Sequence, residues 1–232
     1  MEPRKNLGWA VSGSGTILRA VLEGCAQGLL QSAVRIVICD RPSTIEPFLL
    51  SSGILCHRLE PSRFPGPDAY QRAIKECLIG NRVDWMGLTF NRLLSPLVID
   101  ALDGRIFNIH MSRLPDFKGF HPIRQALASG GEYAGATVHA VDAGMDTGPI
   151  LAQVTVAIDR ADTESTLGRR LFETLLPCVL QTLRAIEREQ VVLDADRFPR
   201  WPAMPLRNGT GLTVSDVDAD LAEFSRAFCR RL

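Results

Sequence analysis

Apolar and polar residues follow two different rhythms along this chain. Short apolar runs predict strands, and longer segments with apolar residues at helical spacing predict helices. The predicted strands are residues 7–11, 34–39, 54–59, 85–90, 106–110, 136–141 and 150–155. The predicted helices are residues 17–27, 68–79, 96–102, 123–129, 163–188 and 218–231. Strands that alternate with helices are typical of an α/β fold with a mostly parallel sheet.

Local features refine this outline. Only residues 142–149 join the last two strands, so we expect that pair to be antiparallel. Ser95 can cap the helix that follows it, and Pro177 predicts a kink or break in the long helix. The composition shifts after Leu193, where residues 197–211 are rich in Pro, Trp, Arg and Gly and predict a linker or surface wrap. We therefore expect a main domain over residues 1–193 and a C-terminal extension, linker plus helix, over residues 194–232.

Composition narrows the class of protein. The chain has 232 residues, of which 46% are apolar and 22% charged, which suits one folded domain with an appendage. Its 26 basic and 26 acidic residues cancel, which argues against a nucleic-acid partner held by phosphate contacts. No apolar run is long enough to span a membrane, and the start lacks a signal-peptide pattern. Six cysteines without a CxxC pair favour free thiols, so we expect a cytoplasmic protein.

A glycine-rich turn follows the first strand. It reads Gly13-Ser14-Gly15-Thr16 and leads into the first helix. Such a turn can aim backbone N–H groups at an anion, although a plain strand-to-helix turn would also use these glycines. It is neither a full dinucleotide fingerprint, because Leu18 takes the third glycine position, nor a Walker loop.

Polar residues interrupt two apolar stretches near the middle of the chain. Asn108 and His110 alternate on one face of a predicted strand, near its carboxyl end, where ligand crevices form in α/β sheets. A structural histidine with satisfied hydrogen bonds would fit equally well. Asp146 precedes a later strand in Met-Asp-Thr-Gly-Pro, and it is either a turn residue or part of a site.

Taken in order, these segments resemble the folate-dependent formyltransferase family. The resemblance rests on Asn108-Ile-His110, Leu114-Pro115, Gly119, Gly135-x-Thr137-x-His139 and Asp146-Thr-Gly-Pro149, with support from Phe90-Asn-Arg92-Leu-Leu-Ser-Pro96 and from the glycine-rich turn. It covers about residues 6–193 and is greatest to the glycinamide ribonucleotide (phosphoribosylglycinamide) branch of the family. It implies a Rossmann-like formyltransferase fold, mostly parallel, with an antiparallel C-terminal strand pair.

The resemblance implies a catalytic set of Asn108, His110 and Asp146. Formyl transfer needs a donor for the developing oxyanion and a group that moves a proton away from the attacking amine. Asn108 can donate its amide N–H to the oxyanion, and a protonated His110 can do the same or shuttle the proton. Asp146 near His110 would favour the imidazolium and could accept the amine proton directly or through water.

The resemblance also implies binding residues for both substrates. For the donor, 10-formyltetrahydrofolate, they are Arg92, Leu93, Val141, Asp142, Ala143 and Gly144. For the amine acceptor they are Gly13, Ser14, Gly15, Thr16, Lys118, Gly119, Arg169 and Glu173, with Thr137, His139 and His121 as orienting residues. No metal is expected, because the cysteines lack zinc-site spacing and no HExxH occurs.

Three departures from the family pattern weaken the choice of glycinamide ribonucleotide as acceptor. The family's phosphate loop usually continues Gly-Ser-Asn-Leu, where this chain has Gly15-Thr-Ile17-Leu. Phe172 stands where the family carries an acidic residue for the ribose hydroxyls, with Glu173 one step away. Met111 stands where a proline usually follows the catalytic histidine.

We therefore expect formyl transfer from 10-formyltetrahydrofolate to the primary amine of a small, phosphate-bearing acceptor, with glycinamide ribonucleotide of purine biosynthesis first. An amino sugar nucleotide or another specialised amine is the alternative. A second is hydrolysis, as in formyltetrahydrofolate deformylases, which usually carry an N-terminal regulatory domain for which a first strand at Leu7 leaves no room. A silent binding module is disfavoured by the intact catalytic set, and transfer to methionyl-tRNA by the zero net charge.

The C-terminal extension has two interpretations. Residues 206–228 resemble the segment after the catalytic domain in sugar-amine and methionyl-tRNA formyltransferases. Alternatively, the last helix packs its stripe of Leu221, Phe224 and Phe228 on the main domain or on a partner subunit, which would make a homodimer.

Overall fold

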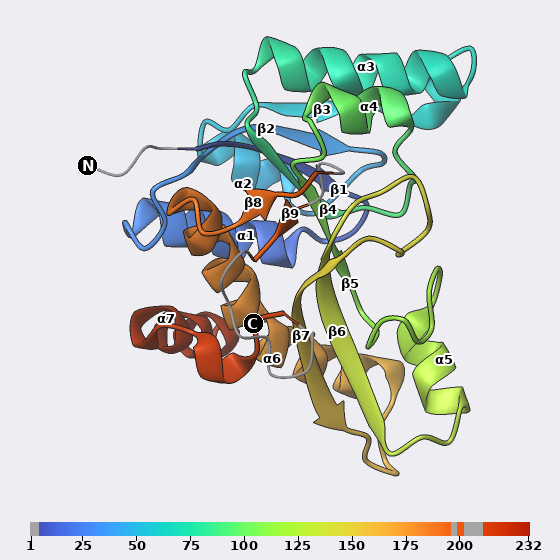
Figure 1. Ribbon diagram of the computed structural model, residues 1–232, viewed down its shortest axis with the longest axis vertical. Helices are drawn as coiled ribbons and strands as arrows, with labels where there is room; N and C mark the ends of the chain where they lie inside the picture. Colours follow the sequence, from blue (N-terminus) through green and yellow to red (C-terminus); the bar gives the residue numbers. More distant parts are fainter. Residues whose placement is uncertain (1–4, 196–198, 202–210) are drawn as a thin grey trace.

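A seven-stranded sheet forms the centre of the molecule in a computed structural model that describes residues 5–195, 199–201 and 211–232 (Figure 1). The strand order is β3-β2-β1-β4-β5-β6-β7. The strands are β1 (Asn6–Val11), β2 (Ala33–Cys39), β3 (Cys56–Arg58), β4 (Trp85–Thr89), β5 (Ile106–His110), β6 (Tyr133–Ala140) and β7 (Ile150–Ala157). Strands β3, β2, β1, β4 and β5 are parallel, while β6 runs antiparallel to both β5 and β7. The predicted α/β class and the antiparallel pair are confirmed.

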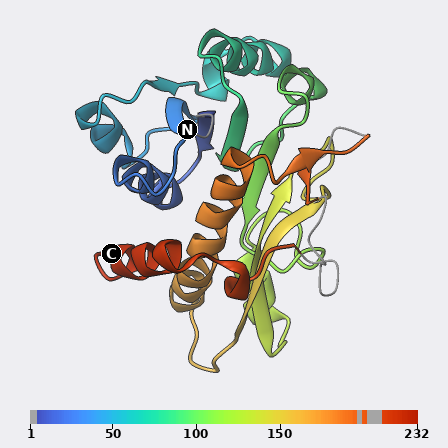
Figure 2. The same cartoon turned by 60° about the vertical axis from the view of Figure 1, so that its left-hand side comes forward.

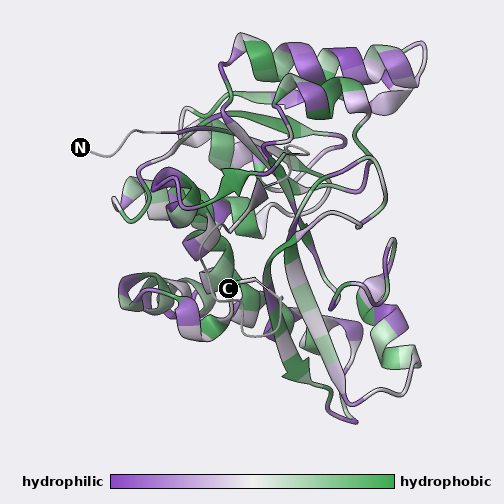
Figure 3. Cartoon of the chain, in the orientation of Figure 1, coloured by the Kyte–Doolittle hydropathy of each residue, from purple (hydrophilic) through white to green (hydrophobic). Residues whose placement is uncertain are grey.

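Helices cover both faces of this sheet. They are α1 (Thr16–Ala26), α2 (Glu46–Ser51), α3 (Pro67–Gly80), α4 (Pro96–Ala101), α5 (Pro122–Ala128), α6 (Glu164–Glu187) and α7 (Ala219–Cys229), with short 3-10 turns at Pro61–Arg63 and Val214–Asp216. Helices α3 and α4 lie together on one side, and α1, α6 and α7 lie on the other (Figure 1). The ribbons of α3 and α7 alternate between hydrophobic and hydrophilic residues, as expected for helices with one buried face (Figure 3).

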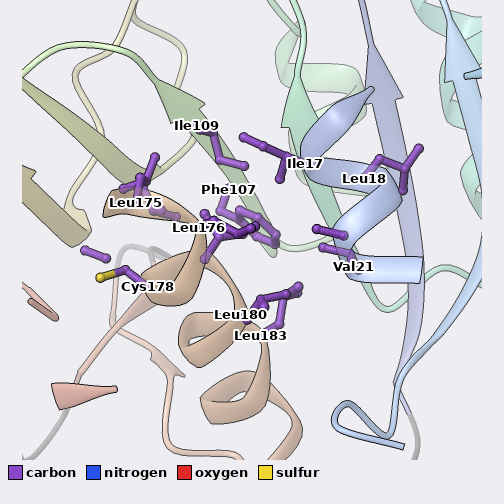
Figure 4. Packing of buried hydrophobic residues seen from close by; sticks show 14 of the residues in the cluster. Ile17, Leu18, Val21, Phe107, Ile109, Leu175, Leu176, Cys178, Leu180 and Leu183 are labelled. Atoms are coloured by element: carbon purple, nitrogen blue, oxygen red, sulfur yellow. The ribbon is translucent and has the colours of Figure 1, made fainter. Parts of the chain in front are cut away.

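The long helix α6 anchors the larger part of the core. Its Leu176 and Leu180 gather with Phe107 of β5 and Val21 of α1 (Figure 4). The Phe107 ring meets the edge of Trp9 at a centroid distance of 5.7 Å. A Cβ at Gly87 would lie 2.6 Å from the Trp9 ring, so only glycine leaves room for this contact. The core therefore fixes β5, the strand that carries Asn108 and His110.

Several local predictions were wrong or incomplete. Helix α2 was not predicted, because its six residues are too few to establish a period, and neither was the small pair of β8 (Val192–Leu193) with β9 (Pro199–Arg200). Helix α6 runs unbroken through Pro177. Ser95 is the N-cap residue of α4, but its buried hydroxyl has no partner among the described residues. Most of the predicted linker at 197–211 lies outside the described residues.

The C-terminal extension packs on the main body. Leu212 exchanges backbone hydrogen bonds with Leu151 and Gln153 of β7, at 2.8 and 3.0 Å. Helix α7 then lies across α1 and α6 (Figure 2) and buries Leu221, Phe224 and Phe228. The interpretation in which this stripe covers the domain is thus confirmed. Among the helices that the structure describes, none combines the length and the apolar character needed to cross a bilayer.

Candidate active site

A cleft of about 300 Å³ opens at the carboxyl ends of β4 and β5. One group of its lining residues is apolar, with Leu88, Phe90, Leu94 and Val141 among them. The other group is polar and comprises Asn108, His110, His139 and Asp146. The cleft therefore offers an apolar slot beside a cluster of hydrogen-bonding side chains, which is the usual character of a small-molecule site.

Strand pairing brings the polar cluster together. Asn108 and His110 lie two residues apart on β5, so both side chains reach the same face. The antiparallel register pairs Asn108 with His139 of β6. Asp146 enters from the loop between β6 and β7 with φ of +52°, a left-handed conformation that aspartate tolerates better than most residues. Groups 38 residues apart in the sequence thus meet at one end of the cleft.

The Asp146 carboxylate lies at the middle of this cluster. Its Oδ2 accepts a hydrogen bond from the Gly119 backbone N–H at 2.8 Å and lies 3.4 Å from His110 Nδ1. Its Oδ1 lies 3.4 Å from both His139 Nε2 and Asn108 Nδ2. The side chains of His110 and Asp146 are 9% and 11% exposed, so solvent screens their interaction only weakly.

The ionisation of Asp146 follows from these contacts. Burial is the largest single influence and raises the pKa of this carboxyl. Hydrogen bonds from His139 and Gly119, together with the nearby charge of His110, outweigh burial and hold the pKa of Asp146 below its ordinary value. At neutral pH the group is therefore an anion that can accept a proton or orient a cation.

The two imidazole rings differ in their hydrogen bonds. His110 Nε2 lies 3.0 Å from the Phe117 carbonyl oxygen, so both ring nitrogens of His110 face oxygen atoms. His139 Nδ1 donates to the Ala140 carbonyl oxygen at 2.8 Å, and its Nε2 lies 3.2 Å from Asn108 Nδ2. His139 thereby holds the amide of Asn108, whose Oδ1 has no partner within the described part of the chain.

The loop after β5 closes one side of the cluster under backbone strain. Phe117, Gly119 and His121 all have positive φ, at 51°, 85° and 56°. Phe117 supplies the carbonyl oxygen and Gly119 the N–H that contact the catalytic candidates. Strained backbone that persists beside a polar cluster is typical of a functional site.

The glycine-rich turn also borders the cleft. Gly13 lines the cleft, and Gly15 has φ of +72°. A Cβ at Gly15 would lie 2.8 Å from Ile45, so this close approach requires glycine. The Ser43 hydroxyl donates to the Gly13 carbonyl oxygen at 2.6 Å, and the turn leads into the N-terminus of α1, whose first N–H groups can bind an anion.

An ion-pair cluster around Asp40, which the sequence analysis did not predict, lies beside the cleft. Asp40 follows β2, is fully buried, and binds Arg92 Nε at 2.8 Å and Arg41 Nη2 at 3.0 Å. Burial is the largest influence on the pKa of Asp40 and raises it, but the bonds from Arg41, Arg92 and Ser12 hold that pKa below its ordinary value. The cluster fixes Arg92 at the cleft. Asp40 lies at the carboxyl end of a parallel strand, and this position was the sequence signal that could have predicted it.

About half of the predicted binding and orienting residues line this cleft, and the others do not. Those that line it are Gly13, Arg92, Leu93, Gly119, His139, Val141, Asp142 and Gly144. Those outside its lining are Ser14, Gly15, Thr16, Lys118, His121, Thr137 and Ala143. Thr137 is fully buried and bonds Ser112 and Leu114, and His121 begins α5. Arg169 and Glu173 line a separate recess against α7. Lining residues that were not predicted include Ile17, Leu88, Phe90, Phe120 and Met145.

Comparisons with known proteins fit this geometry. Residues 5–180 match the family model described as "Formyl transferase". The chain is 34% identical to the phosphoribosylglycinamide formyltransferase of Bacillus subtilis strain 168 over 168 residues, which is 70% of this chain and 84% of the relative. It is 36% identical to that of Mycobacterium tuberculosis over 164 residues, which is 70% of this chain and 76% of the relative. The structure of glycinamide ribonucleotide transformylase 1 from Symbiobacterium toebii superposes with a TM-score of 0.80 at 34% identity, covering 85% of this chain and 94% of that one.

Proposed function

Because this chain belongs to the formyl transferase family, we propose that it transfers a formyl group from 10-formyltetrahydrofolate to the primary amine of a small, phosphate-bearing acceptor. The observation that carries this proposal is the convergence of Asn108, His110 and Asp146 at one end of a single cleft. An amide donor, an imidazole and a carboxylate are the three groups that acyl transfer to an amine requires.

The reaction can be written with all atoms accounted for. The amine nitrogen attacks the formyl carbon, the bond from that carbon to N10 of the folate breaks, and one proton passes from the amine to N10. The products are the N-formyl amine and tetrahydrofolate. No covalent bond to the protein forms in this scheme.

Each member of the cluster has a role that its contacts support. Asp146 is ionised and can accept the amine proton directly or through water. The Asn108 amide nitrogen has two hydrogens, which face Asp146 and His139, so it can donate to the developing oxyanion once one of these two partners is released. His110 can donate from Nε2 once the formyl oxygen replaces the Phe117 carbonyl oxygen as its acceptor.

The cleft suits a flat, partly polar ring system as donor. Leu88, Phe90, Leu94 and Val141 form an apolar slot beside the catalytic cluster. Asp142 holds the neighbouring loop by accepting from Gly144 N at 3.0 Å and Thr147 Oγ1 at 2.6 Å, which leaves backbone groups of this loop at the slot's rim. These residues would hold the pterin, and the folate supplies the formyl group.

Glycinamide ribonucleotide is the first candidate acceptor. The relatives reported above are named as formyltransferases of this compound. The glycine-rich turn at the start of α1 could hold its phosphate. Two side chains that depart from the family pattern are apolar, however: Ile17 lines the cleft, and the partly buried Phe172 packs against the core. The alternative acceptor is an amino sugar nucleotide or another specialised amine.

The test supplies purified protein with 10-formyltetrahydrofolate and one amine at a time. Tetrahydrofolate is followed by absorbance, and the formylated product by mass spectrometry. We expect turnover with glycinamide ribonucleotide or, failing that, with a nucleotide-linked amine. Release of formate at the same rate with and without amine would identify a hydrolase and overturn the proposal.

A further inference from the structure

A second recess, of about 230 Å³, lies between α6 and the C-terminal turn of α7. Its lining residues are Arg169 and Glu173 from α6 and Arg226, Cys229 and Arg230 from α7. Arg169 Nε donates to Glu173 Oε1 at 2.8 Å, so the single carboxylate already has a partner. Within the described part of the chain, no side-chain hydrogen bond or ion pair engages Arg226 or Arg230.

The charge in this recess is unbalanced. Three guanidinium groups share the space with one carboxylate, and like charges at close range repel each other. The carbonyl end of α7 attracts cations, which accounts for Arg226 and Arg230 but not for a third guanidinium facing them from another helix. A bound anion would remove the repulsion, and guanidinium groups match phosphate oxygens in geometry as well as charge.

Helix α7 is held firmly enough to build a site. Arg184 of α6 binds Asp220 Oδ2 at 2.6 Å and Asp218 Oδ2 at 2.8 Å, which fixes the start of α7. Phe224 and Phe228 bury their rings in the core. The C-terminal turn is tied as well, since Arg231 donates to Glu23 of α1 at 2.7 Å. The two free arginines therefore stand on a backbone that is anchored at both ends.

The contact between Arg231 and Glu23 connects the helix that lines the recess to α1, which begins at the glycine-rich turn. Glu23 lies eight residues beyond Gly15, which is about 12 Å along α1. The C-terminal turn of α7 is thus tied to α1, the helix that begins at the glycine-rich turn. Arg169 lines the recess from α6. Leu171, two residues further along this helix, is buried in the same core cluster as residues of α1. The turn and the recess are thus connected through α1, α6 and α7, which pack on one another.

We propose that Arg169, Arg226 and Arg230 bind a phosphate group of the acceptor that lies beyond the phosphate at the glycine-rich turn. The acceptor is then an amine that carries two separate phosphates, because the two phosphates of a diphosphate are too close together to reach both sites. The anion site stands on its own geometry, whereas its assignment to the acceptor rests on the proposed function. Helix α7 lies outside residues 5–180 that match the family model, so the extension contributes two of the three arginines.

The first experiment measures binding of inorganic pyrophosphate to the full chain by isothermal titration calorimetry. Arg226→Ala/Arg230→Ala should weaken binding at least ~10-fold, because two charge-assisted partners are lost. The matched control, Arg72→Ala/Arg160→Ala, removes two exposed arginines elsewhere and should leave the affinity unchanged. Melting temperatures should agree among all three proteins. Equal affinity in all three, or no binding by the unaltered chain, would overturn the proposal.

The second experiment connects the recess to the acceptor. Pyrophosphate should inhibit formyl transfer competitively against the amine, and Arg226→Ala/Arg230→Ala should raise KM for the amine but not for the folate. If binding depends on the arginines but no amine is formylated, the anion site stands and the proposed function fails. If an amine is formylated with the same KM by both proteins, the recess is not part of the acceptor site and this inference fails.

Discussion

At the scale of single residues, Asp146 connects the whole polar cluster. It contacts two imidazole rings, one amide and one backbone N–H, and it does so from a left-handed backbone conformation. A carboxylate with this many donors is well suited to stay ionised while it orients its neighbours. His139 adds a constraint that strand pairing provides, since it holds the Asn108 amide from the neighbouring strand.

Substitutions in this cluster should separate catalysis from stability. His110→Ala or Asp146→Asn is expected to lower kcat by at least ~10²-fold, because each removes a proton-transfer or charge-stabilising group. Their melting temperatures should stay near that of the unaltered chain. His57→Ala and Asp116→Asn, outside the cleft lining, serve as controls with full activity. Unaltered turnover in either site variant would remove that residue from the mechanism.

The lowered pKa of Asp146 predicts how stability depends on pH. A carboxyl whose pKa is lower in the folded chain stabilises it above the unfolded pKa, near ~3.9. This contribution is lost as the pH falls from there through the lower folded pKa. Asp146→Asn should therefore make the loss of stability between neutral and strongly acidic pH less steep.

Urea unfolding at a series of pH values measures this slope. Asp40 is held below its ordinary pKa in the same sense, so Asp40→Asn should also flatten the acid side of the curve. An Asp146→Asn curve parallel to that of the unaltered chain would show that the carboxylate gains nothing from its partners.

At the scale of elements, the start of α4 shows how tertiary contacts replace a local cap. The Ser95 backbone N–H donates to Gln71 Oε1 of α3 at 3.0 Å, while the Ser95 hydroxyl is buried without a partner among the described residues. Gln71 also donates to the Leu93 carbonyl oxygen at 3.0 Å. One side chain from a neighbouring helix thus holds the segment between the cleft residue Leu93 and α4.

This arrangement predicts opposite results for two substitutions. Ser95→Ala should change the unfolding free energy by less than about 0.5 kcal/mol or stabilise the chain, because no hydrogen bond is lost. Gln71→Ala should cost about 1–3 kcal/mol, since it leaves two backbone groups without their partner. Chemical denaturation of both variants measures the difference. A loss of about 1 kcal/mol in Ser95→Ala, the usual cost of removing a cap, would contradict this interpretation.

At the scale of the whole molecule, the extension and the main body share one core. Leu212 continues the backbone pairing of β7, and α7 buries Leu221, Phe224 and Phe228 against α1 and α6. Residues 194–232 remain a predicted unit of the sequence, but their packing favours folding together with residues 1–193.

Removal of the extension should therefore unfold or loosen the rest. A chain ending at Leu193 is expected to lose its cooperative thermal transition and to bind a hydrophobic dye, because the faces of α1 and α6 under α7 become exposed. The full chain should show one transition by both circular dichroism and calorimetry. A truncated chain with an unchanged melting temperature would contradict this expectation.

The sequence by itself determined the elements and the chemistry. The spacing of apolar residues predicted the strands and the longer helices, because burial of one face imposes a period that is visible in the chain. Asn108, His110 and Asp146 were predicted as a catalytic set from the family resemblance of their motifs, and polar groups in an apolar strand need partners in any case. The short helix α2 has too few residues for a period to appear.

Only the tertiary structure decided which groups meet. The pairing of Asn108 with His139, the clamp of Asp40 on Arg92 and the partnership of Gln71 with Ser95 join residues 31, 52 and 24 positions apart. No local pattern encodes such distances, because they depend on strand register and on how helices pack. The recess at α7 is a further case: its arginines are exposed positions without a motif, and they form a site only where two helices bring them together.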